Sequence, residues 1–278
     1  MVTALLAAFC LQPVFVQTDI VYAKPAGEEL KMDIYIPASA MQSDTVSANP
    51  AVVLIHGGGW VAGKREDMKD FIPVLNKAGF VVANISYRLA PKHKFPAQWD
   101  DVQTAVRFLR ANADKFMINP KQIGSCGASA GGHLAMMLGY SDTRDKNATD
   151  NPKFSSKVGA VFNIFGPVDA TKPFPKAVDN LFVMVLGKPK DQATEELKAS
   201  SPITHISKTS APTYTIHGTK DPLVPVEQAQ FLKEALQKAG VPCDETIIEG
   251  MGHGIDQNDP KVMAALEKGI LWLQKYLK

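Results

Sequence analysis

The chain has 278 residues, a formal net charge of +2, and 45% hydrophobic and 21% charged residues. This composition excludes a disordered chain, and the length fits one large or two small globular domains. The near-zero charge excludes the basic excess typical of nucleic-acid-binding proteins, and no apolar run reaches the roughly 20 residues needed to span a bilayer. We therefore expect a globular protein with no nucleic-acid partner and no stable membrane insertion, and the sequence leaves its oligomeric state open.

The first residues have features of a signal peptide. Residues 2–11 form an apolar run that is long enough for the core of a signal peptide and ends in small residues, although no Lys or Arg precedes it. We therefore predict that residues 1–12 are a signal-peptide remnant and that the protein is secreted or periplasmic. The alternative is a mature N-terminus that covers a hydrophobic surface, in a cytoplasmic protein.

The cysteines indicate neither a disulfide framework nor a metal site. Cys10, Cys126 and Cys243 are too few for the first, and no C-x-x-C pair suggests structural zinc. If the N-terminus is cleaved, Cys126 and Cys243 remain, and the sequence leaves open whether they pair.

Eight segments are predicted to be strands. Residues 14–22 and 30–36 alternate apolar and polar side chains, which predicts a half-exposed antiparallel pair joined by a turn at 25–27. The later segments are mostly continuous apolar runs, typical of strands buried on both faces of a parallel sheet. They are residues 51–55, 80–86, 158–164, 213–217 and 243–249, with a weaker candidate at 122–126 that contains the poor strand formers Gly124 and Ser125.

Apolar residues at helical spacing lie between these strands. The clearest stripes span residues 99–109, 231–236 and 262–273. This alternation predicts an α/β fold, with a mostly parallel eight-stranded sheet flanked by helices. No repeat or long linker divides residues 13–278, which we expect to form a single domain. Residues 166–202 contain five prolines, and this segment is either a small lid or a decorated crossover.

The strongest local motif is G-x-S-x-G at residues 127–131, between a predicted strand and a predicted helix. It centres on Ser129, and the flanking glycines permit a tight turn that exposes the serine hydroxyl above the sheet. The new helix directs its N-terminal amides toward the same point. The alternative is a glycine-rich helix start in which Ser129 only caps the helix.

A second glycine-rich motif, H-G-G-G-W at residues 56–60, directly follows a predicted strand. Three consecutive glycines let bare backbone amides approach a ligand, as stabilisation of an oxyanion requires. The segment also fits the dinucleotide fingerprint G-x-G-x-x-A formally, but the next strand ends without the acidic residue that would bind a ribose. A flexible turn is the remaining alternative.

A nucleophilic serine requires a base and an orienting carboxylate. Of the six histidines, His253 is favoured because it lies in a glycine-flanked loop after the last predicted strand. The others fit local or structural positions: His56, His93, His133, His205 and His217. Asp221, in a turn just beyond its strand, is the favoured acid, with Asp169 and Asp256 as alternatives. The order Ser129, Asp221, His253 is the order found in α/β-hydrolases.

The chain resembles α/β-hydrolases of the esterase and lipase superfamily that carry the HGGG motif. It is similar to hormone-sensitive-lipase-type esterases and to the bacterial acetyl and feruloyl carbohydrate esterases close to them. The matching segments are residues 56–60, 87–91, 95–97, 127–132, 217–225 and 252–253. The resemblance implies Ser129 as nucleophile, Asp221 as orienting acid and His253 as general base. It also implies an oxyanion hole formed by the amides of Gly58, Gly59 and Ala130.

Two departures from hormone-sensitive-lipase-type esterases bear on the substrate. The long helical cap before the first strand is missing, and Ala128 stands where those enzymes often carry an acid. We therefore expect a minimal cap and a shallow acyl pocket with Trp60 as a wall. The expected substrates are small or polysaccharide-linked esters with short acyl or feruloyl groups, such as those of plant-wall polysaccharides.

The expected reaction proceeds through an acyl-enzyme and needs no cofactor or metal. An arylformamidase or a peptidase would use the same catalytic groups. A non-catalytic α/β-hydrolase that acts as a receptor or scaffold is a further alternative, although such proteins usually lack a triad member.

Overall fold

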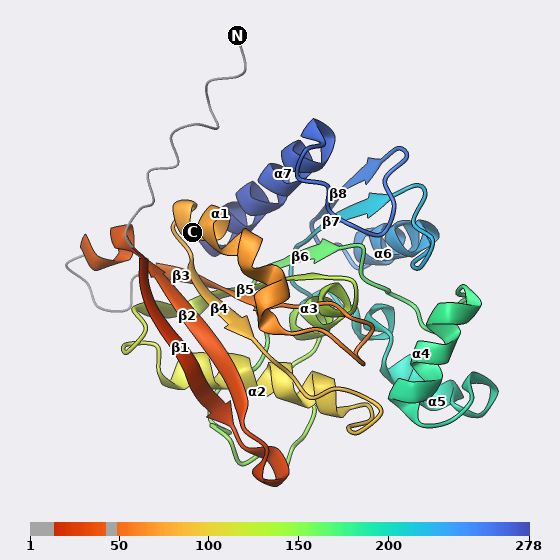
Figure 1. Cartoon of the computed structure of the whole chain (residues 1–278), viewed down its shortest axis with the longest axis horizontal. Helices are drawn as coiled ribbons and strands as arrows, with labels where there is room; N and C mark the ends of the chain where they lie inside the picture. The colour runs from red at the N-terminus through yellow and green to blue at the C-terminus, as the bar shows by residue number, and fades with distance from the viewer. Residues whose placement is uncertain (1–13, 43–48) are drawn as a thin grey trace.

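A computed structural model of the chain describes residues 14–42 and 49–278 (Figure 1). The predicted signal-peptide remnant lies outside the described residues. An eight-stranded sheet with strand order β1-β2-β4-β3-β5-β6-β7-β8 forms the centre of the fold. The strands are β1 (Val14–Ala23), β2 (Leu30–Pro37), β3 (Asn49–Ile55), β4 (Val81–Ile85), β5 (Ile118–Ala128), β6 (Val161–Ile164), β7 (Thr213–Gly218) and β8 (Cys243–Ile248). The predicted α/β class and mostly parallel sheet are confirmed, since β1–β2 and β2–β4 are antiparallel pairs and the other five neighbouring pairs are parallel.

Helices cover both faces of the sheet. They are α1 (Ile72–Lys77), α2 (Ala97–Ala111), α3 (Ala130–Tyr140), α4 (Lys176–Leu186), α5 (Thr194–Ala199), α6 (Glu227–Lys238) and α7 (Pro260–Leu277). Val53 and Ile55 of β3 face the core beneath α2, α3 and α6, whereas Val52 and Leu54 face the core beneath α1 and α7. Burial on both faces explains why this strand is a continuous apolar run.

The parallel strands bring the candidate residues together at the carboxyl ends of the strands. Ile55, the last residue of β3, pairs with Gly127 near the end of β5, and Gly218 of β7 pairs with Ile248 of β8. The loops that follow these strands carry the H-G-G-G-W motif, Ser129, Asp221 and His253. Residues that are far apart in the sequence therefore meet above the carboxyl ends of neighbouring strands.

Strand β5 is longer than its weak sequence pattern predicts, because it begins at Ile118 and not at residue 122. Its glycine has a packing role: a Cβ on Gly124 would lie 2.6 Å from Cδ1 of Leu277 in α7. The poor strand former therefore makes room for the helix that covers it. Strand β6 is shorter than predicted and begins at Val161.

Two further differences concern helices. The short helix α1 is not predicted by the sequence pattern, and the segment 166–202 contains α4 and α5. Figure 1 shows these two helices, drawn in green, outside the layers that flank the sheet.

The two lateral edges of the sheet are formed by different elements. The β1–β2 hairpin forms one end, and β8 forms the other, where it pairs with β7 on one side only (Figure 1). Most β8 side chains are partly or fully exposed. Both described cysteines are free thiols: Cys126 is buried in the core, and Cys243 is half-buried at the start of β8.

Candidate active site

Ser129 occupies a strained turn between β5 and α3. Its backbone has φ 56° and ψ −121°, a conformation that residues with a side chain rarely adopt. A Cβ on Gly127 would lie 2.4 Å from the backbone of Gly131, and one on Gly131 would lie 2.1 Å from the carbonyl oxygen of Ile55. The glycines of G-x-S-x-G are therefore required by the close approach of strand and helix, and the serine stands at the apex of the turn.

Ser129, His253 and Asp221 form a continuous chain of contacts. His253 Nε2 lies 2.9 Å from Ser129 Oγ, and His253 Nδ1 lies 2.6 Å from Asp221 Oδ2. Because an ionised carboxylate can only accept, Nδ1 carries the proton and Nε2 of the neutral ring is free to accept one from the serine. The structure brings together the three residues that the sequence singles out.

The Asp221 carboxylate is held in the state that suits this arrangement. Its side chain is fully buried, and Oδ1 accepts backbone hydrogen bonds from Leu223 at 2.8 Å and Val224 at 2.9 Å. Burial raises the pKa of Asp221, but the hydrogen bonds from His253, Val224 and Leu223 together lower it more, so the pKa lies below its ordinary value. The carboxylate is therefore ionised at neutral pH.

The two alternative acids are engaged elsewhere. Asp169 closes a turn by accepting hydrogen bonds from the amide and hydroxyl of Thr171, and the exposed Asp256 accepts from Asn258. The other five histidines also have hydrogen-bonding partners of their own, namely Gly57 for His56, Glu28 for His93, Trp60 and Ser200 for His133, Ala199 for His205 and Val224 for His217.

Gly58, Gly59 and Ala130, the residues expected to form the oxyanion hole, lie in the same pocket as Ser129. Gly58 and Gly59 have φ values of 104° and 59°, and a Cβ on Gly58 would lie 2.2 Å from the carbonyl oxygen of Ala62. Ala130 is the first residue of α3, so its amide has no acceptor within the helix. These three residues line one pocket together with Ser129, as an oxyanion-binding site requires.

This pocket has a volume of about 320 Å³ and mostly apolar walls. Phe165, Pro167, Leu223 and Val224 line it from the loops after β6 and β7. Helix α4 contributes Val178 and Leu181, so the segment 166–202 supplies part of the wall. That this segment acts as a small lid stays a prediction.

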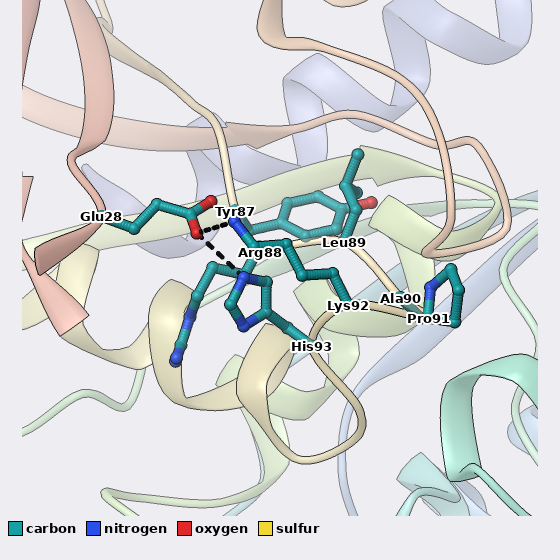
Figure 2. A pocket seen from close by; sticks show the side chains of 8 residues that line it. All are labelled: Glu28, Tyr87, Arg88, Leu89, Ala90, Pro91, Lys92 and His93. Atoms are coloured by element: carbon teal, nitrogen blue, oxygen red, sulfur yellow. Dashed lines mark hydrogen bonds and ion pairs between the residues drawn. The ribbon is translucent and has the colours of Figure 1, made fainter. Parts of the chain in front are cut away.

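A larger groove of about 550 Å³ lies beside residues 87–93 and is lined by none of the candidate catalytic residues (Figure 2). Its charged groups are paired with one another or with neighbours. Glu28 accepts from Lys92 at 2.6 Å and contacts His93 Nε2 at 2.9 Å, and Arg88 forms an ion pair with Asp101. The smaller pocket at Ser129 is therefore the candidate active site.

Comparison with known proteins places this geometry in a family. The chain matches the BD-FAE family over residues 32–236, which is more than half of its length. It belongs to the BD-FAE family. This family member shares 34% identity over 219 residues with Esterase LipC of Mycobacterium tuberculosis (strain ATCC 25618 / H37Rv), covering 76% of this chain and 54% of LipC.

Two solved structures are similar over almost the whole chain. The bifunctional GH43-CE protein of Bacteroides eggerthii has 32% identity and a TM-score of 0.81, covering 95% of this chain and 38% of that one. The thermophilic esterase Est2 of Thermogutta terrifontis has 26% identity and a TM-score of 0.79, covering 94% of this chain and 92% of that one. These esterase structures identify the fold as that of an α/β-hydrolase. The BD-FAE-family chain spans about half the length of the curated relatives it matches.

Residues 14–42 and 49–278 contain no cluster of metal-binding side chains and no helix that could span a membrane. Within these ranges, no three His, Cys, Asp or Glu side chains are grouped so that they could hold a metal ion. None of the helices there is both long and apolar enough to cross a bilayer.

His133 is a neighbour of the site that sequence reasoning assigns no role. Its Nδ1 accepts a hydrogen bond from Trp60 Nε1 at 3.3 Å, and its Nε2 donates to the carbonyl oxygen of Ser200 at 2.6 Å. The three residues are 67 or more positions apart, so no local pattern could have indicated this contact. Through these two hydrogen bonds, His133 links the glycine-rich loop to the segment 166–202.

The burial of His133 predicts a pH-dependent stability. Burial lowers the pKa of His133 from its ordinary value of 6.5 to about 4. The hydrogen bond to Ser200 raises this pKa, but by less than burial lowers it. The unfolded chain therefore takes up a proton below pH 6.5 that the folded chain refuses until about pH 4. The contribution of His133 to the free energy of unfolding is therefore fully present above pH 6.5 and decreases as the pH falls. Between pH 7 and pH 5 this loss amounts to about 2 kcal/mol.

Urea unfolding of the wild type and of His133→Leu at pH 7 and pH 5 checks this. The variant should be less stable at pH 7, but it should lose about 2 kcal/mol less on acidification. Since His56 and His217 titrate in both proteins, the difference isolates His133. Equal losses in the two proteins would contradict the prediction.

Proposed function

We propose that this protein is a serine carboxylic-ester hydrolase. The observation that carries the proposal is the set of contacts that joins Ser129 through His253 to the buried Asp221. Ser129 and His253 line a mostly apolar pocket together with Gly58, Gly59 and Ala130. The relatives support it, because LipC and Est2 are both named esterases.

In the proposed reaction, Ser129 Oγ attacks the ester carbonyl carbon while His253 Nε2, at 2.9 Å, accepts the hydroxyl proton. Asp221 keeps the imidazole in the required tautomer and stabilises its protonated form. His253 then donates the proton to the leaving alcohol, and an acyl-enzyme remains. Water attacks the acyl carbon by the same steps and releases the acid.

The negative charge that develops on the carbonyl oxygen would be stabilised by the amides of Gly58, Gly59 and Ala130. These residues line the pocket beside Ser129, and Ala130 begins a helix whose dipole favours negative charge at this end. Backbone donors of this kind are fixed before the reaction, so little reorganisation is needed when the charge forms.

The proposed substrates are esters with short acyl or feruloyl groups, including those carried by plant-wall polysaccharides. The pocket of about 320 Å³ has room for a small acyl group, with Trp60 as a wall. Structures of Est2 are described as propionate-bound and butyrate-bound, and the Bacteroides eggerthii protein as a bifunctional GH43-CE. Plant-wall polysaccharides lie outside the cell, which agrees with the proposed secreted or periplasmic location.

A panel of p-nitrophenyl esters from acetate to palmitate, with acetylated xylan and methyl ferulate, tests the function and the substrate class. We expect kcat/KM to be highest for acetate to butyrate and to collapse by octanoate. Each methylene adds about 0.8 kcal/mol of binding only where the pocket can enclose it. A preference for decanoate or longer would contradict the short-acyl proposal. Absence of acetate or ferulate release would contradict the plant-wall proposal.

A further inference from the structure

A second, much smaller cavity lies behind the active-site pocket. Its volume is about 10 Å³, enough for about one water molecule, and its apolar lining includes Phe95, Leu134, Phe182 and Val185. Trp60 lines this cavity and also the pocket that contains Ser129, and the two share no other lining residue. Trp60 is therefore the partition between them, as the one lining residue that both have.

Trp60 is held firmly in this position. The residue is 4% exposed, its ring packs against Phe182 with centroids 5.4 Å apart, and Nε1 donates to His133 at 3.3 Å. His133 and Phe182 both line the rear cavity, so the contacts that fix the indole come from that side. Residues of the rear cavity therefore hold the indole of Trp60 in place.

We propose that Trp60 sets the maximum acyl-chain length by blocking the passage of the chain into the rear cavity. The inference rests on the proposed ester hydrolysis, because it assigns a specificity role to one wall of the same site. A smaller side chain at this position would join the two spaces into one apolar channel. That channel would be lined by Leu134, Phe182 and Val185 beyond the present end of the pocket.

Trp60→Leu opens the partition, and Trp60→Phe is the matched control. Both variants remove the Nε1–H that His133 accepts, so they lose the same hydrogen bond and differ mainly in volume. Each additional enclosed methylene raises kcat/KM about fourfold. In Trp60→Leu we expect the octanoate-to-butyrate ratio of kcat/KM to rise at least about tenfold, with less than about a threefold change in Trp60→Phe. An unchanged ratio in Trp60→Leu, or an equal rise in both variants, would overturn the proposal.

A binding measurement keeps the test independent of catalysis. Octanoate and butyrate are titrated by calorimetry into Ser129→Ala and into Ser129→Ala/Trp60→Leu. The double variant should favour octanoate over butyrate at least about tenfold more than the single variant does, and equal preference would overturn the proposal even if Trp60→Leu hydrolyses no ester. If the wild type hydrolyses no ester at all, the proposed function fails, whereas this comparison still decides the role of Trp60.

Discussion

Replacing Ser129 with alanine should lower kcat for p-nitrophenyl acetate by roughly 10⁴ to 10⁶, because the members of a catalytic triad act as a unit. The fold should be retained, since the substitution removes only the hydroxyl that contacts His253 and alanine leaves the strained backbone unchanged. Steady-state kinetics and a thermal melt of the same preparation measure the two expectations.

Ser125→Ala is the matched control for this variant. Ser125 also belongs to β5, but its hydroxyl is buried and donates to the carbonyl oxygen of Ala135 in α3. Its loss should cost about 1 kcal/mol of stability and leave kcat nearly unchanged. Paraoxon, which phosphorylates Est2 of Thermogutta terrifontis, should label the wild type and Ser125→Ala but not Ser129→Ala. Labelling of Ser129→Ala, or more than a few per cent of residual activity, would identify another nucleophile.

Asp221→Asn should lower kcat by about 10⁴ while leaving KM little changed. An asparagine amide can donate to Nδ1 of His253, which favours the tautomer that carries its proton on Nε2 and cannot accept one from Ser129. Kinetics across the pH range measures the loss, and the variant should stay impaired at every pH at which it is folded.

The alternative acids provide the controls. Asp169→Asn and Asp256→Asn should have mild effects, because these carboxylates close turns with Thr171 and Asn258 and make no contact with His253. Asp169 is buried, so its variant also needs a stability measurement. A loss of activity in either variant as large as that in Asp221→Asn would show that the assignment to Asp221 is wrong.

The parts of the fold that the sequence predicts are those in which burial is regular. In β3, Val52 and Leu54 face one core and Val53 and Ile55 the other, so an unbroken apolar run indicates a central parallel strand. The six-residue helix α1 is too short for a helical period to show. Helices α4 and α5 lie in a segment that contains five prolines, and prolines usually indicate irregular structure, so the sequence pattern does not predict these helices.

The same distinction applies to the site. Ser129 and the glycines around it could be predicted because a strained turn and close backbone contacts require particular residues at fixed spacing. The contact of Trp60 with His133 joins residues 73 positions apart, and only the folded chain brings them together. Sequence reasoning correctly excludes His133 as the base for Ser129, but it has no means of finding the neighbour that His133 does have.

The position of His253 would make the proposed hydrolysis sensitive to the integrity of one edge strand. The contact between His253 and Ser129 links residues 124 positions apart, and it depends on β6, β7 and β8 being paired in sequence beside β5. Strand β8 is paired on one side only, and most of its side chains are partly or fully exposed. Exposed edge strands open locally at lower free energy than the core. On gradual heating, the proposed esterase activity should therefore be lost before the core melts. Loss of turnover would then report local opening of strand β8 and not global unfolding.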